Sequence, residues 1–237
     1  MEERRKMSRN KKVILINGGS GTGKTYSIKK LINTLGSKVA YINLDGKTRL
    51  GFKGKSKIAK FITPLDPLEV NQGVRDIEED PNIEYVIIDT LSFYMDQIEQ
   101  KHVIFEHDSQ GAWGKVYAAS VKDLLHFAMN VSTKSWIFMS HTQEGEVKNF
   151  VTPTKAYAKG AVGRLGVEAY FDTVLYTNVF DDDRSEDGVG YRFQTRKTKE
   201  SRGLSVKSPE GMFPNVYTDS TDIIEVFRFI DEYDEED

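Results

Sequence analysis

The segment with the clearest chemical signature lies near the start of the chain. Residues 18–25 read GGSGTGKT and match G-x-x-x-x-G-K-[ST] at every fixed position: Gly18, Gly23, Lys24 and Thr25. In this pattern glycines let backbone N–H groups surround a phosphate, the lysine reaches the β- and γ-phosphates, and the threonine hydroxyl is a Mg²⁺ ligand. The pattern therefore predicts a site for a nucleoside triphosphate. The expected nucleotide-binding residues are Gly18, Gly19, Ser20, Gly21, Thr22, Gly23, Lys24, Thr25 and Tyr26.

The residues on either side of this loop support the interpretation. The apolar run at 12–17 predicts a buried strand, and residues 24–35 predict a helix that Gly36 ends. A loop between a strand and a helix can direct its amides and the helix N-terminus at one phosphate. A dinucleotide-binding fingerprint fits poorly, because Lys24 stands where G-x-G-x-x-G from Gly19 requires glycine.

A second Mg²⁺ ligand is expected at the end of another buried strand. Residues 85–89 read YVIID, so Asp89 follows four apolar or aromatic residues and terminates the strand. A carboxylate at that position would face the phosphate loop and hold Mg²⁺ through water. We therefore predict Thr25 and Asp89 as the metal residues.

The remaining pattern alternates strands with helices. This alternation predicts an α/β fold with a mostly parallel central sheet flanked by helices. An acidic turn, DDDRSEDG, joins the last two strands and predicts an antiparallel pair toward the C-terminus. Further strands are expected at residues 38–44, 59–62, 135–140, 169–177 and 190–196, and helices at 67–79 and 112–131.

Composition and charge narrow the class of protein. The 237 residues include no cysteine, which excludes disulfides, cysteine nucleophiles and thiolate metal sites. The net charge of −3 hides an uneven distribution, because residues 231–237 carry six carboxylates whereas residues 1–12 and 191–207 are basic. We predict a basic segment at 1–11, one ATPase domain at 12–230 and an acidic tail at 231–237.

The apolar runs are too short to suggest a membrane protein. The longest, at 13–16 and 136–139, fall far below the roughly 20 residues that span a bilayer. No signal peptide is expected either. We therefore expect a cytoplasmic protein without a membrane partner.

The order of these segments resembles the RecA-like P-loop ATPase core. Within that family it is similar to the small phage-encoded RecA-like proteins of the Sak type, which act in single-strand annealing and recombination. The resemblance covers residues 12–200, and the phosphate loop is its most specific part. It implies ATP and Mg²⁺ as cofactors, a homo-oligomer, and the host-cell cytoplasm as the location.

The resemblance also implies further catalytic residues beside Lys24. VAYINLD resembles the strand ending in the carboxylate that activates water, which points to Asp45, where the family usually has glutamate. WIFMSHTQ resembles the strand whose terminal Gln143 senses the γ-phosphate. TRKTKE resembles the strand with a Lys-x-Lys pair, Lys197 and Lys199, that reaches the γ-phosphate of the neighbouring subunit.

Structural roles are the alternative interpretation of these residues and stay open. Asp45 is also typical of a turn, in LDGK, and Gln143 of the polar end of a strand. Lys197 and Lys199 also fit an exposed strand face. His141, beside Gln143, fits a structural role better than a catalytic one.

A DNA-binding loop is implied in the same way. GAVGRLGVEAYFDTVLYT resembles the glycine-containing loop of RecA and the strand after it, placing Lys155, Lys159 and Arg164 near single-stranded DNA. Cations interleaved with aromatics, here including Lys148 and Phe150, are also the composition that single-strand binding requires. An ordinary solvated loop is the alternative.

The sequence thus predicts an ATP-hydrolysing protein of DNA recombination or single-strand annealing, with single-stranded DNA and phage recombination or replication proteins as partners. One alternative is an ATPase switch or loader for a phage replication or packaging complex. The other is a small-molecule P-loop kinase. A kinase lid is typically rich in arginine, whereas residues 45–60 contain only Arg49.

Overall fold

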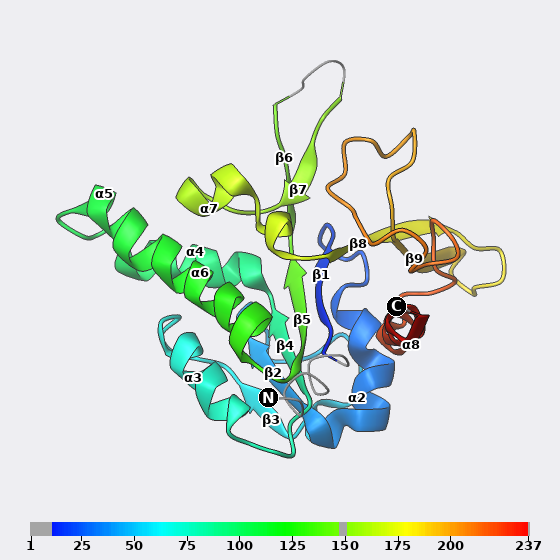
Figure 1. Cartoon of the computed structure of the whole chain (residues 1–237), viewed down its shortest axis with the longest axis horizontal. Helices are drawn as coiled ribbons and strands as arrows, with labels where there is room; N and C mark the ends of the chain where they lie inside the picture. Colours follow the sequence, from blue (N-terminus) through cyan, green and yellow to red (C-terminus); the bar gives the residue numbers. More distant parts are fainter. Residues whose placement is uncertain (1–10, 147–150, 237) are drawn as a thin grey trace.

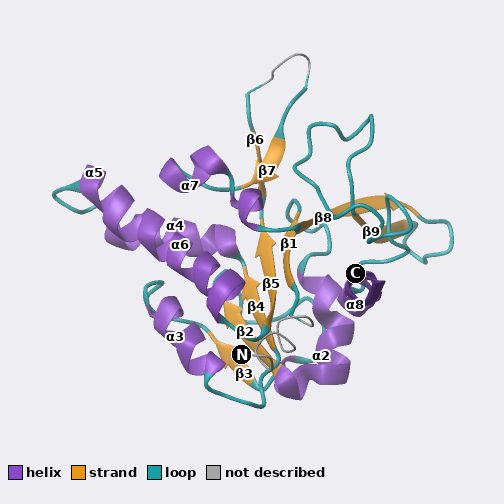
Figure 2. Ribbon diagram, in the orientation of Figure 1, coloured by secondary structure: helices purple, strands orange, loops and turns teal. Residues whose placement is uncertain are grey.

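The computed structural model describes residues 11–146 and 151–236. Within these ranges a seven-stranded sheet forms the centre, with the strand order β3-β2-β4-β5-β1-β8-β9 (Figures 1 and 2). Its strands are β1 (Val13–Asn17), β2 (Val39–Asn43), β3 (Lys60–Ile62), β4 (Tyr85–Asp89), β5 (Ser135–Ser140), β8 (Thr173–Asp181) and β9 (Val189–Gln194). A separate antiparallel pair consists of β6 (Thr142–Glu144) and β7 (Thr154–Ala156).

The sheet has the predicted topology. Within this sheet β3, β2, β4, β5, β1 and β8 pair in parallel, and β9 pairs antiparallel with β8. Strand β5 lies between β1 and β4, so the strand before the phosphate loop and the strand ending in Asp89 are not adjacent. The predicted α/β class with a mostly parallel sheet is therefore confirmed, and the carboxyl ends of β1, β5, β4 and β2 meet at one edge of the sheet.

Helices cover both faces of the sheet, which explains the continuous apolar runs of its strands. One face packs against α3 (Glu69–Glu78), α4 (Leu91–His102) and α6 (Ala119–His126), and the other against α2 (Lys29–Leu35) and α8 (Ile223–Glu236) (Figure 1). Alternate side chains of β1 divide between the two cores: Leu15 joins the first, while Ile14 and Ile16 join the second.

Several helices differ from the sequence prediction. The predicted helix at 24–35 begins as a 3₁₀ turn, Thr25–Ile28, before α2. The predicted helix at 112–131 is a longer composite in which α5 (Ser109–Ala112) and α6 alternate with π-helical turns. The strand predicted from residue 169 begins at Thr173, because residues 167–170 form a 3₁₀ turn.

Three helices were not predicted: α4, α7 (Gly160–Leu165) and α8. Helix α4 follows Asp89 directly, and its N-cap Thr90 accepts a hydrogen bond from Phe93 N. Helix α8 contains residues 231–236 of the predicted acidic tail, because Val226, Phe227 and Ile230 pack into the core at helical spacing.

The predicted basic segment at the N-terminus is described only at its last residue. Of the predicted basic segment 1–11, residues 1–10 lie outside the described residues, and Lys11 donates to Met129 O and Ser132 O. None of the helices in the described part of the chain is long and apolar enough to cross a membrane.

Candidate nucleotide-binding site

The phosphate loop follows β1 and has a backbone that side chains would obstruct. Gly21 and Gly23 have φ values of +74° and +95°, in the left-handed region that favours glycine. A Cβ atom on Gly18 would lie 1.9 Å from Thr177 Oγ1 of β8. Gly18 N donates to Ser140 O, at 3.2 Å, which ties the loop to the end of β5. Glycine at these positions therefore has local steric causes.

Lys24 is buried beneath this loop. Its Nζ atom donates to Gly18 O at 2.7 Å and to Gly19 O at 2.6 Å, and lies 3.5 Å from His141 Nδ1. Burial lowers the pKa of Lys24 to about 8, although the nearby Asp89 opposes the shift. The ammonium is thus held at the loop carbonyls, close to where the loop amides would hold phosphates.

Thr25 and Asp89, the two residues predicted to hold Mg²⁺, contact each other. Thr25 Oγ1 donates to Asp89 Oδ2 at 2.9 Å, and the Tyr41 hydroxyl donates to the same carboxylate oxygen. Burial raises the pKa of Asp89, while the hydrogen bonds from Tyr41 and Thr25 oppose that shift. A hydroxyl and a carboxylate held together in this way fit the preference of Mg²⁺ for oxygen ligands.

This pair is not part of a larger cluster of metal ligands. In the described ranges no group of three or more His, Asp or Glu side chains could hold a metal ion. Mg²⁺ in nucleotide sites usually binds one or two protein ligands together with substrate phosphates and waters. The site therefore has the ligand number expected for a metal that arrives with a nucleotide.

These residues open into one cavity of about 640 Å³ at the carboxyl edge of the sheet. Residues 45–51 and Tyr191 of β9 form its rim, and a Cβ atom on Gly23 would lie 3.1 Å from Tyr191 Cδ1. The side chains that line the cavity include Lys24, Thr25, Tyr26, Tyr41, Asp45, Lys47, Arg49, Asp89, His141, Asp187 and Tyr191.

Asp45 lies in this cavity but is engaged by its own turn. Its carboxylate contacts Lys47 Nζ at 2.7 Å and accepts a hydrogen bond from Lys47 N at 3.0 Å. These contacts are those of the turn interpretation, and the activation of water by Asp45 stays a prediction.

Gln143 does not line the cavity. It belongs to β6, and its Nε2 atom donates to Ala158 O at 3.2 Å. The cavity residue at the end of β5 is His141, whose backbone N donates to Ser92 Oγ at 2.7 Å and whose ring packs edge-on against Phe93. Burial and the positive charge of Lys24 lower the pKa of His141.

The predicted cations lie away from the nucleotide cavity. Lys197 and Lys199 are exposed in the loop after β9, and neither lines the cavity. Lys159 forms an ion pair with Glu99, and Lys155 Nζ donates to Gly163 O at 3.3 Å. Arg164 is exposed near the end of α7, Gly160–Leu165. Lys148 and Phe150 lie outside the described residues.

Tyr41 and Tyr191 are the aromatic cavity residues that sequence reasoning missed. Tyr41 is buried in β2, and its ring stacks on Phe61 with centroids 5.0 Å apart. Its place next to β4 depends on the strand order, so the run VAYIN contained no local signal of a contact with Asp89.

The fold and this site define a P-loop ATPase. Residues 10–213 match the profile of the AAA domain family, and the chain belongs to that family. Among solved structures 92 chains match. One is described as the crystal structure of the RadB recombinase, with 16% sequence identity, coverage of 84% of this chain and 90% of that chain, and a TM-score of 0.45. No curated protein matches.

Proposed function

We propose that this protein binds ATP with Mg²⁺ in the P-loop cavity, hydrolyses the ATP, and acts on single-stranded DNA in recombination or strand annealing. The observation that carries the ATPase part is the convergence of Lys24, Thr25 and Asp89 with the phosphate loop in one cavity. The DNA part, and the similarity to phage Sak-type proteins, are supported by the order of sequence motifs.

The contacts suggest how the phosphates would be held. Lys24 Nζ would exchange the carbonyls of Gly18 and Gly19 for phosphate oxygens, a change of partner that needs little movement. Thr25 and Asp89 would hold Mg²⁺, which neutralises charge on the transferring phosphoryl group. Tyr41 would fix the orientation of the Asp89 carboxylate.

The remaining catalytic roles divide between this chain and a neighbour. Among the carboxylates of the cavity, Asp45 is the one that the sequence resemblance points to for orienting water, once it exchanges its contacts with Lys47. Lys197 and Lys199 lie outside the cavity of their own chain, so a role at a γ-phosphate requires a second copy in a homo-oligomer. Gln143 would need to leave its contact with Ala158 O to reach the phosphate.

A phosphotransferase is the second candidate function. Lys47 and Arg49, on the same rim segment of the cavity, place two cations where an acceptor phosphate could bind. Analysis of the products with nucleoside and nucleotide acceptors separates the two functions, since only a kinase forms a phosphorylated acceptor.

The direct test is the rate of phosphate release from Mg·ATP, with and without single-stranded DNA and at two salt concentrations. We expect release without any acceptor and a DNA-dependent increase that weakens with salt, since phosphate contacts displace counterions. Hydrolysis indifferent to DNA, with no DNA binding in a folded sample, would overturn the DNA part. Absence of hydrolysis and of nucleotide binding would overturn the whole proposal.

Nucleotide affinity should fall as the pH rises through about 8. The pKa of Lys24 is lowered to about 8, so above that value the free protein loses the ammonium that binds phosphates. An unperturbed lysine, with a pKa of about 10.4, would hold its charge well beyond pH 9. Titration with a fluorescent ATP analogue from pH 6 to about 10 measures the effect.

The matched variant for this pH profile is Lys24→Arg, because a guanidinium stays protonated throughout. If Lys24→Arg binds the analogue, the affinity of this variant should not fall as the pH rises through 8. A wild-type affinity that stays constant to pH 10 would contradict the lowered pKa.

Removing the Tyr41 hydroxyl should weaken the response to Mg²⁺. Tyr41→Phe keeps the ring on Phe61 but deletes one of two hydrogen bonds that orient Asp89 Oδ2. We expect the Mg²⁺ concentration for half-maximal hydrolysis to rise about 3- to 10-fold, the range for one lost hydrogen bond. Nucleotide binding in EDTA should change little.

Tyr94→Phe is the matched control for Tyr41→Phe. Tyr94 is equally buried, and its hydroxyl donates to Asn71 Oδ1, 3.3 Å away, outside the nucleotide cavity. Equal Mg²⁺ requirements in the two variants would show that Tyr41 does not position Asp89.

A further inference from the structure

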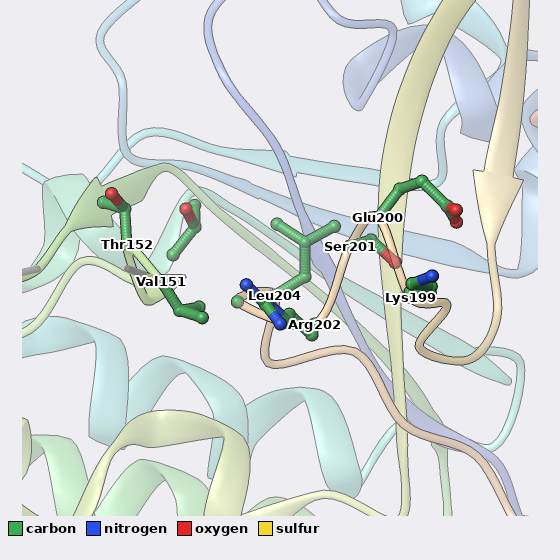
Figure 3. Close-up of a pocket in the computed structure, with 9 residues that line it drawn as sticks. Val151, Thr152, Lys199, Glu200, Ser201, Arg202 and Leu204 are labelled. Carbon is green, nitrogen blue, oxygen red and sulfur yellow. The ribbon is translucent and has the colours of Figure 1, made fainter. Parts of the chain in front are cut away.

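A second cleft, separate from the nucleotide cavity, lies between two segments far apart in the sequence (Figure 3). One wall is the chain entering β7, from Val151 to Thr154, and the other is the loop 199–204 after β9. The cleft has a volume of about 530 Å³. No sequence motif predicted this cleft, because its two walls lie some 45 residues apart in a chain of 237.

The two walls are fixed to each other by backbone contacts. Thr154 N donates to Gly203 O at 2.8 Å, and Ser205 N donates to Thr154 O at 3.1 Å. A Cβ atom on Gly203 would lie 2.3 Å from Thr152 O, so glycine permits this close approach. The cleft is therefore preformed, which lowers the entropy cost of binding a ligand there.

The loop wall is also braced from within. Ser201 Oγ accepts a hydrogen bond from Thr198 N at 2.9 Å and another from the side chain of Gln194, at the end of β9. These contacts hold the backbone between Lys199 and Arg202 and present the two cationic side chains from a defined loop.

The charge in the cleft is available to a ligand. Lys199 and Arg202 are both exposed, and within the described residues neither has an ion-pair partner at 4.0 Å or less. Glu200 is the one acidic residue of the lining. In Figure 3 Arg202 and Leu204 lie between Val151 and Lys199, so cationic and apolar groups share the surface.

The lysines expected to bind DNA contrast with this pair. Lys159 is paired with Glu99, and Lys155 is half-buried with its Nζ atom on Gly163 O. Using either on a phosphate would require breaking an existing contact, whereas Lys199 and Arg202 have no such contact to lose among the described residues.

We propose that this cleft binds the phosphodiester backbone of single-stranded DNA. Arg202 and Lys199 contact phosphates, and the apolar side chains of Val151 and Leu204 contact sugars or bases, the combination by which proteins hold single strands. Lys197 does not line the cleft, so with Lys199 on DNA it is the member of the Lys197–Lys199 pair left to reach the γ-phosphate of a neighbour. The proposal rests on the proposed DNA-binding function and adds its location. It also assigns a role to Arg202, which no motif singled out.

The test is binding of a fluorescein-labelled oligo(dT) of about 20 nucleotides, measured by anisotropy over a range of salt concentrations. We expect Arg202→Ala and Lys199→Ala each to weaken binding several-fold at low salt and to reduce the slope of log affinity against log salt by about 0.7 to 1. Arg202→Lys should restore most of the slope, because it keeps the charge. Lys122→Ala, an exposed cation on α6 outside the cleft, is the matched control.

A photo-crosslinking amino acid at Leu204 gives a second measurement that does not depend on loss of affinity. It should crosslink to the oligonucleotide, whereas the same group at Lys122 should not. If the wild type binds the oligonucleotide but the cleft variants match Lys122→Ala and Leu204 gives no crosslink, the cleft assignment is wrong and the DNA-binding function stands. If the folded wild type binds no oligonucleotide, the proposed function itself fails.

Discussion

Replacing Lys24 by methionine is expected to lower the rate of ATP hydrolysis by at least about 100-fold, the usual effect of removing one group that stabilises transition-state charge. Lys24 Nζ lies on the carbonyls of Gly18 and Gly19, at the centre of the phosphate loop, and no other lysine in the described ranges is buried in this cavity. The rate of phosphate release at saturating Mg·ATP measures the loss.

The Lys24→Met protein should remain folded. Methionine removes the hydrogen bonds to Gly18 O and Gly19 O but also removes a buried charge, whose desolvation lowers the pKa of Lys24, so an apolar chain of similar length should cost little thermal stability. The control is Lys57→Ala, an exposed lysine that hydrogen-bonds Asn33 and lies outside the cavity. A folded Lys24→Met protein that hydrolyses ATP at the wild-type rate would place the active site elsewhere.

Asp89→Asn is expected to have a similarly large effect, again about 100-fold or more on hydrolysis. The amide keeps the size of the side chain and one oxygen for Thr25 and Tyr41, but it lacks the negative charge that holds Mg²⁺. The measurement is the rate of phosphate release across a Mg²⁺ titration, in which the variant should not reach the wild-type rate at any concentration.

The affinity of Asp89→Asn for ATP in the absence of metal should not fall as its hydrolysis rate does. In EDTA, Asp89→Asn should bind ATP at least as tightly as the wild type, because a carboxylate near the phosphates has been removed. Asp187→Asn, which removes an exposed carboxylate at the rim of the same cavity, should alter neither property substantially. Equal Mg²⁺ dependence of Asp89→Asn and the wild type would exclude Asp89 as a metal ligand.

The parts of this protein that could be read from sequence are those in which local physics suffices. Eight consecutive residues specify the phosphate loop, because the left-handed conformations of Gly21 and Gly23 and the position of Lys24 are properties of one short segment. Strands β1, β2, β4 and β5 were readable because burial on both faces requires continuous apolar runs. The class of fold followed from their alternation with helices.

Helix α8 shows where local reading was insufficient. Its apolar residues Val226, Phe227 and Ile230 lie just before six carboxylates, and the acidic composition predicted a tail. Packing of the apolar stripe against the second core extends the helix through residue 236. Asp231 of this helix forms an ion pair with Lys12, the residue just before β1. Tertiary burial outweighed the local charge repulsion.

The finer composition of the site depended on which elements became neighbours. Tyr41 reaches Asp89 because β2 pairs with β4, and His141 rather than Gln143 lines the cavity because β5 ends one residue before the histidine. Lys159 forms an ion pair with Glu99, sixty residues earlier in the sequence. The loop that contains Lys199 is hydrogen-bonded to the start of β7 through Gly203 O and Thr154 N. Such contacts join side chains through strand order and loop paths, which no spacing along the chain encodes. The three-dimensional packing alone therefore determined which of several equally plausible charged residues have partners and which are available to a ligand.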